Sequence, residues 1–209
     1  MTLLYSSLMT TQRQTTRTGG RPLRADAERT VTTILEAAER TLGRDPAATM
    51  EQIAEAAGVA RTTVHRRFAT REALVDALTA WATKQFAAAV DAAHPDTAPP
   101  LVALYQTTAN VLSVKIGWGF AMSRASSADP EVARVHTDVL DTCERLFHRA
   151  QQTGLLRADI DTQWARRVYY ALIHEAAQSR NDDKDTDALA TLVVDTLLHG
   201  IGTHRLNGL

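Results

Sequence analysis

Apolar residues recur every three or four positions over most of this chain, which is the spacing of one face of an amphipathic helix. No segment shows the strict alternation of apolar and polar residues that predicts a β-strand, and no internal repeat is visible. Glycine, proline and helix-capping residues divide the periodic stretches into about nine segments. The pattern therefore predicts an all-α protein.

The stretch 49–74 has the pattern of two short helices joined by a tight turn and followed by a third helix. Thr49 can cap the first helix, and Gly58 supplies the left-handed residue that ends it. The second helix is expected over 61–68, with Val64 and a closing phenylalanine on its buried side. Thr70 can cap the third helix. This order of elements predicts a helix-turn-helix.

The outward side of the second short helix is polar and basic. It carries three guanidinium groups, two hydroxyls and an imidazole, and such groups donate to the phosphates and base edges of DNA. These outward residues are Arg61, Thr62, Thr63, His65, Arg66 and Arg67. The alternative interpretation is a solvated helix in an ordinary bundle.

The segment AGVARTTVHRRFATREAL resembles the DNA-binding domain of TetR-family transcriptional regulators. The resemblance is specific, because it fixes about a dozen positions at one spacing. Three positions depart from the family pattern: Ala60 replaces a serine-like cap, His65 a tyrosine, and Arg67 a histidine. Both His65 and Arg67 can still donate to a phosphate, so the resemblance implies retained phosphate binding.

The resemblance implies binding to a double-stranded DNA operator. We expect Arg61 and Thr62 to contact base edges, and Arg66 to contact either a base or a phosphate. Phosphate contacts are expected from Thr63, His65 and further residues around the motif. The complete set of expected DNA-binding residues is Thr49, Arg61, Thr62, Thr63, His65, Arg66, Arg67 and Arg71.

The chain is expected to have three parts. Residues 1–24 are rich in Thr, Ser, Gln and Arg and predict a flexible basic arm. This arm either contacts DNA or is a solvated tail, and Met9 is an alternative start to Met1. Residues 25–72 form the expected helix-turn-helix domain, and 73–209 a helical bundle for ligand binding and dimerisation.

Local signals also place several helices of the bundle. The helix that begins at Thr70 is long enough to enter both domains, and Gly117 and Gly119 interrupt a later helix. The sequence Asp129-Pro130-Glu131 combines an N-cap, a first-turn proline and an acid, so it predicts a helix start. The resemblance implies that the last two helices, roughly Thr162–Gln178 and Thr186–Gly202, pair with their copies in a homodimer.

Aromatic, histidine and sulfur-containing side chains on inward stripes are the expected lining of a ligand cavity for a small hydrophobic effector. Trp118 and Phe120 are the strongest candidates, because the neighbouring glycines indicate an irregular, movable segment. The alternative for each residue is an ordinary place in the core. The expected ligand-binding residues are Trp81, Phe86, Tyr105, Trp118, Phe120, Met122, His136, Cys143, Phe147, Tyr169 and His174.

Composition and charge argue against a membrane-spanning, secreted or disulfide-bonded protein. The formal net charge of the 209 residues is −1, yet residues 1–80 hold 11 basic and 9 acidic residues, so this part is positive. Hydrophobic residues make up 44%, but no apolar run reaches the ~20 residues that span a bilayer. The opening segment lacks the pattern of a secretory signal, and Cys143 is the single cysteine. We expect a cytoplasmic protein without disulfides or contact with a membrane.

The histidines are scattered and no pair has zinc-ligand spacing, and neither a phosphate-binding glycine loop nor a nucleophile elbow is present. We therefore expect no enzyme activity, no metal and no cofactor. The predicted function is a ligand-responsive transcriptional regulator, a repressor that a small apolar effector releases from a palindromic operator. The alternatives are a helical dimer that binds small molecules but has lost specific DNA binding, which Ala60 and His65 suggest, and an all-α enzyme.

Overall fold

The computed structural model describes residues 20–124, 129–178 and 185–199, and within these ranges it consists of nine α-helices with no strand. The predicted all-α class is confirmed. None of the described helices combines the length and the apolar character that a membrane span requires.

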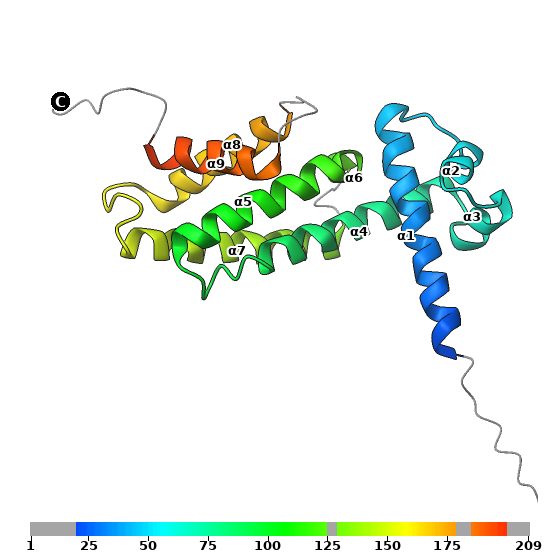
Figure 1. The fold of residues 1–209 in the computed structure, drawn as a ribbon, viewed down its shortest axis with the longest axis horizontal. Coiled ribbons are helices and arrows are strands. Elements are labelled where there is room, and N and C mark those ends of the chain that lie inside the picture. Colours follow the sequence, from blue (N-terminus) through cyan, green and yellow to red (C-terminus); the bar gives the residue numbers. More distant parts are fainter. Residues whose placement is uncertain (1–19, 125–128, 179–184, 200–209) are drawn as a thin grey trace, which may run out of the picture.

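The molecule is elongated, and three helices form one end of it (Figure 1). Helix α1 comprises Gly20–Arg44, α2 Met50–Ala56 and α3 Arg61–Arg67. Helix α4, Arg71–Asp91, begins in this group and runs on into the rest of the molecule. The pair α2 and α3 is the predicted helix-turn-helix, braced by α1.

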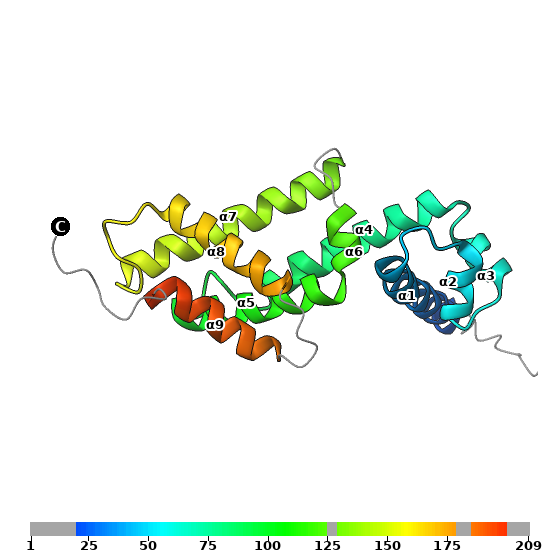
Figure 2. The ribbon, with the colours of Figure 1, turned by 90° about the horizontal axis from the view of Figure 1, so that it is seen from above.

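Five further helices build the other part of the molecule. They are α5 (Pro100–Gly117), α6 (Gly119–Arg124), α7 (Pro130–Gln152), α8 (Thr162–Gln178) and α9 (Thr186–His199). Helix α5 is central, since it packs against α4, α7, α8 and α9. Seen from above, α8 and α9 lie far from α2 and α3 (Figure 2).

Helix α4 belongs to two separate hydrophobic cores. Leu74 and Leu78 are fully buried in the N-terminal core, which also contains Ile34, Ile53 and Val64. Near the other end of α4, Val90 is buried in the C-terminal core. The large buried side chains of this core are those of Leu104, Leu112, Leu146, Phe147, Tyr169 and Ile173. Because one helix contributes to both cores, it fixes the position of the helix-turn-helix relative to the bundle.

The helix boundaries follow the local signals in the sequence. The Thr49 hydroxyl accepts a hydrogen bond from the Gln52 amide, and the Gln52 side chain accepts one from the Thr49 amide, so α2 has a full capping box. Asp129 caps α7 through two backbone amides. Gly58 and Gly154 have φ of 65° and 75°, which is the left-handed region that favours glycine.

Helix α1 begins earlier than the sequence predicts. It starts at Gly20, so the segment 20–24, which the composition assigns to the flexible arm, is helical. Residues 1–19 lie outside the described residues. Pro22 falls in the first turn of α1, where a missing amide hydrogen is tolerated. The predicted last helix ends at His199 in the described part of the chain, and Gly202 lies outside it.

A buried carboxylate joins the two parts of the molecule. Glu39 of α1 is only 7% exposed, and its two carboxylate oxygens accept hydrogen bonds from the amides of Phe120 at 2.6 Å and Ala121 at 2.9 Å. These amides belong to the first turn of α6, where a helix leaves its N–H groups without partners. Burial raises the pKa of Glu39, and the two hydrogen bonds oppose this shift.

Replacing Glu39 by alanine is expected to lower the free energy of unfolding by about 2 kcal/mol, because two enclosed amides lose their acceptor. Urea denaturation followed by circular dichroism measures this change. The control is Glu36→Ala, an exposed glutamate on the same helix. A loss for Glu39→Ala no larger than that of the control would contradict the assigned role.

Candidate nucleic-acid interface and ligand cavity

Helix α3 is anchored on one side only. Val64 and Phe68 are buried in the N-terminal core, and Val59, in the turn before the helix, packs against the same core. The positive φ of Gly58 turns the chain between α2 and α3. The core therefore holds α3 firmly while its opposite side faces solvent at the end of the molecule (Figure 1).

The structure brings six of the predicted DNA-binding residues together on this open side of α3. Arg61, Thr62, His65, Arg66 and Arg67 are exposed, and the sixth residue, a threonine at position 63, is half-buried. Helix α3 lacks a side-chain hydrogen bond at its N-cap, as expected from the alanine at position 60.

Arg61 is already paired in the structure. Its Nε lies 2.7 Å from a carboxylate oxygen of Glu51 in α2, and the same Nε donates to Nε2 of His65 at 3.4 Å. The pKa of Glu51 is lowered, first by its own backbone amide and then by the charge of Arg61. The pair is exposed, so its net contribution to stability is small, and a DNA acceptor can replace the carboxylate.

The side chains of Thr49 and Arg71, also predicted to bind DNA, form hydrogen bonds within the protein. The Thr49 side chain is part of the α2 capping box. The Arg71 guanidinium donates to the carbonyl oxygens of Ala48, at 3.2 Å, and Pro46, so it holds the loop before α2 against the start of α4. Their contact with DNA stays a prediction, whereas their local role follows from these bonds.

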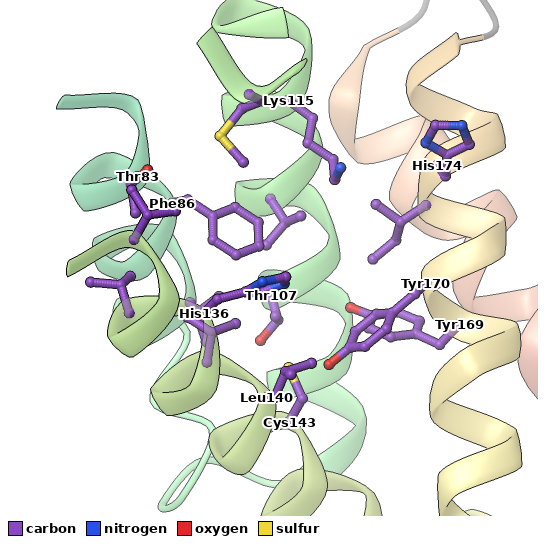
Figure 3. A pocket seen from close by; sticks show the side chains of 17 residues that line it. Thr83, Phe86, Thr107, Lys115, His136, Leu140, Cys143, Tyr169, Tyr170 and His174 are labelled. Carbon is purple, nitrogen blue, oxygen red and sulfur yellow. The ribbon is translucent and has the colours of Figure 1, made fainter. Parts of the chain in front are cut away.

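A cavity of about 380 Å³ lies inside the C-terminal part, between α4, α5, α7 and α8, and Met122 of α6 also reaches it (Figure 3). This is the size range of small-molecule sites. Its lining consists of Thr83, Phe86, Val90, Thr107, Val111, Lys115, Met122, Val132, Val135, His136, Val139, Leu140, Cys143, Tyr169, Tyr170, Ile173 and His174.

Six of the predicted ligand-binding residues line this cavity. They are Phe86, Met122, His136, Cys143, Tyr169 and His174. Their positions agree with the expectation that a cavity lies between these helices. His136 and His174 are exposed residues, so they lie at the edge of the cavity, while Cys143 and Tyr169 are buried.

The other five predicted ligand-binding residues do not line the cavity. Trp81, Trp118 and Phe120 pack against the N-terminal core. The glycines predict an irregular, movable segment, with Trp118 and Phe120 as ligand contacts. In the structure the break instead places α6 against α1, where the carboxylate of Glu39 binds its first turn. The two aromatic residues of this segment therefore join the DNA-binding part.

Tyr105 and Phe147 have clear roles elsewhere. The Tyr105 hydroxyl donates to a carboxylate oxygen of Asp195 at 2.6 Å, which links α5 to α9. Phe147 is fully buried and packs on the Tyr169 ring, with centroids 5.4 Å apart. Both residues thus contribute to the packing of the bundle.

The cavity is mainly apolar but contains buried polar groups. The Thr107 hydroxyl has no hydrogen-bond partner among the described residues, while the Tyr170 hydroxyl lies beside the Cys143 thiol. Burial raises the pKa of Tyr170, Tyr169 and the Cys143 thiol, so these groups are neutral donors near neutral pH. The Tyr169 hydroxyl, by contrast, is bonded to Thr108 at 2.8 Å.

Sequence reasoning missed Thr107, Tyr170 and Lys115. A signal for Lys115 was present, since it is the one charged residue in the 18 residues of α5. Burial lowers the pKa of Lys115. No comparable local signal marks Thr107 or Tyr170, because their positions in the cavity depend on how four helices pack together. Within the described ranges, no group of three or more His, Cys, Asp or Glu residues could hold a metal ion.

The sequence and the fold both match known regulators. Residues 34–78 match the model of the bacterial regulatory proteins of the tetR family. The HTH-type transcriptional repressor LfrR of Mycolicibacterium smegmatis is 32% identical over 177 residues, which cover 84% of this chain and 92% of LfrR. The HTH-type transcriptional regulator NfxB of Pseudomonas aeruginosa is 28% identical over 160 residues, 74% of this chain and 85% of NfxB.

A crystal structure of LfrR in complex with proflavine superimposes with a TM-score of 0.67 at 29% identity and covers 86% of this chain and 99% of LfrR. The helix-turn-helix, the helical bundle behind it and nearly the full length of this relative are therefore shared. The chain belongs to the TetR family, and it is a ligand-responsive, DNA-binding regulator of transcription.

Proposed function

We propose that the protein is a homodimeric repressor that leaves a palindromic DNA operator when a small, largely apolar effector fills the cavity between α4, α5, α7 and α8. The observation that carries this proposal is the presence, in one chain, of an exposed basic helix and a ligand-sized cavity connected by α4. The repressor LfrR and its structure in complex with proflavine support it. Such a protein acts in the cytoplasm without catalysis.

The DNA-binding surface would place α3 in the major groove. Arg61 and Thr62, at the N-terminal end of α3, are proposed to contact base edges, which is where recognition helices read sequence. His65 and Arg67 are proposed to bind phosphates, and Arg66 either kind of group. Arg66 and Arg67 form no ion pair with the described residues, so both are available for DNA.

Dimerisation through α8 and α9 would pair two such helices. Trp164 of α8 is 56% exposed and Leu192 of α9 is 55% exposed, although both are large apolar side chains. The buried side of α8 carries Ala165, Tyr169 and Ile173, so the exposed ring of Trp164 lies outside the core of its own chain. A two-fold dimer would cover this apolar surface and would present two α3 helices to half-sites spaced by ~34 Å or a multiple of it.

Two connections would transmit occupancy of the cavity to α3. Phe86 lines the cavity from α4, whose first turns are buried in the N-terminal core. Met122 lines it from α6, whose first turn is bound by Glu39 of α1. A ligand that prefers a displaced position of α4 or α6 shifts the population toward a state with lower operator affinity, and such coupling is typically ~1 to 3 kcal/mol.

Binding to the DNA that flanks the gene of this protein tests the proposal. The flanking duplex is compared with a scrambled duplex of equal length, by fluorescence anisotropy over a salt series. Preference for the flanking duplex, with two protomers per site and a steep salt dependence, is expected. Equal, weak binding to both duplexes would indicate that specific DNA binding has been lost or that the operator lies elsewhere.

Two arginine variants are expected to behave differently in the same assay. Arg67→Ala should weaken binding to all sequences alike and reduce the salt slope by about 1, because it removes a phosphate contact. Arg61→Ala should cost ~1 to 3 kcal/mol on the preferred sequence and relax preference at one base step. The opposite pattern would exchange the two assignments.

Replacing Trp164 by glutamate is expected to dissociate the dimer. A charge at the centre of an apolar interface should raise the dissociation constant by at least about 30-fold, since central aromatic residues contribute ~2 kcal/mol or more. Analytical ultracentrifugation measures the change. The control is Leu101→Glu, on an exposed apolar residue of α5. An unchanged dimer of the Trp164 variant would contradict the proposed interface.

A further inference from the structure

Lys115 is an unusual member of the cavity lining. It lies on α5, which is otherwise uncharged, and it is half-buried. Figure 3 shows its amine directed into the space between α5 and α8. Across the described residues, no carboxylate forms an ion pair with this amine. As far as the described residues show, the ammonium group is thus partly removed from water without a carboxylate partner.

The rest of the lining carries no negative charge. Neither Asp nor Glu is among the described residues that line the cavity, and its other ionisable groups are histidine, cysteine and tyrosine side chains. Cys143 and Tyr170 are held neutral by burial. A cationic ligand would meet Lys115 without any compensating carboxylate, whereas an anionic ligand would supply the missing counter-charge.

Thr107 and Tyr170 lie at a different level of the cavity from Lys115, whereas His174 lies near the level of Lys115 (Figure 3). Thr107 is eight residues before Lys115 on α5, about 12 Å along the helix axis. Its unpartnered hydroxyl is near the level of Tyr170, and Thr107 is only 2% exposed. The lining also contains the apolar side chains of Phe86, Val111 and Ile173, and Val111 lies midway between Thr107 and Lys115 on α5. The cavity therefore combines a positive group, apolar side chains and hydroxyl groups.

We propose that the effector is an amphipathic organic anion whose carboxylate, or an equivalent acid group, binds the Lys115 ammonium while its apolar body fills the space beside Phe86, Val111 and Ile173. A hydroxyl or carbonyl at its far end is the group that would bind the Thr107 hydroxyl, near Tyr170. That this ligand regulates DNA binding rests on the proposed function, whereas its binding chemistry rests on the cavity alone. The charge of the lining selects against aromatic cations of the same size.

Isothermal titration calorimetry with three matched probes tests this proposal in the absence of DNA. Naphthylacetate, naphthylacetamide and naphthylethylamine share one apolar body and carry an anionic, a neutral and a cationic group. Naphthylacetate is expected to bind at least about tenfold more tightly than the amide, because hydrogen bonds to charged groups contribute more than neutral ones. The amine is expected to bind most weakly.

Variants separate the charge of Lys115 from the shape of the cavity. Lys115→Met should abolish the preference for naphthylacetate, and Lys115→Arg should restore it. Lys84→Met, on an exposed lysine of α4, should keep the preference. Thermal unfolding of each variant shows whether it is folded.

Three results would overturn the proposal: no binding of naphthylacetate to the wild-type protein, equal binding of the three probes, or a preference that survives in folded Lys115→Met. None of these results bears on operator binding, which is measured separately. Conversely, failure to bind an operator would leave the anion preference of the cavity intact, so the two proposals fail independently.

Discussion

Burial of the two ends of α4 in two different cores is the constraint on which the arrangement of this molecule depends. Leu74 and Leu78 are fixed in the N-terminal core, and Val90 is fixed in the C-terminal core. The 21 residues of α4 span about 31 Å, and an α-helix of this length resists bending because each turn is hydrogen-bonded to the next. Helix α4 is therefore the element through which we propose that a displacement at the cavity would reach the helix-turn-helix. The hydrogen bonds of Glu39 to α6 form a second connection between the two parts of the molecule, in addition to α4.

The elements could be predicted because their signals are local. Threonine, aspartate and glycine at helix ends act over one to four residues. The caps at Thr49 and Asp129 and the turn at Gly154 can therefore be recognised in the sequence without any tertiary structure. The helix-turn-helix also has a specific spacing, and its membership in the TetR family is confirmed by relatives that match most of the chain. Its outward residues followed directly from the helical period.

The cavity lining was predicted only in part because it depends on long-range packing. Apolar periodicity shows that Trp118 and Phe120 face inward, but it does not show which of the two cores receives them. A long-range contact decides this: Glu39, 81 residues before Phe120, accepts a hydrogen bond from the Phe120 amide and so holds the first turn of α6 against α1. The periodicity of aromatic residues also does not mark Lys115, the one charged residue of α5, which lines the cavity.

Hydrogen exchange at the backbone amides of Phe120 and Ala121 tests the coupling between DNA binding and the cavity region most directly. Both amides donate to Glu39, far from the DNA-binding surface of α3. If the contact with Glu39 belongs to the operator-bound state, a bound operator duplex slows exchange of both amides in the wild-type protein and not in Glu39→Ala. If the duplex protects only α2 and α3 and leaves these two amides unchanged, the two parts of the protein are not coupled through this contact.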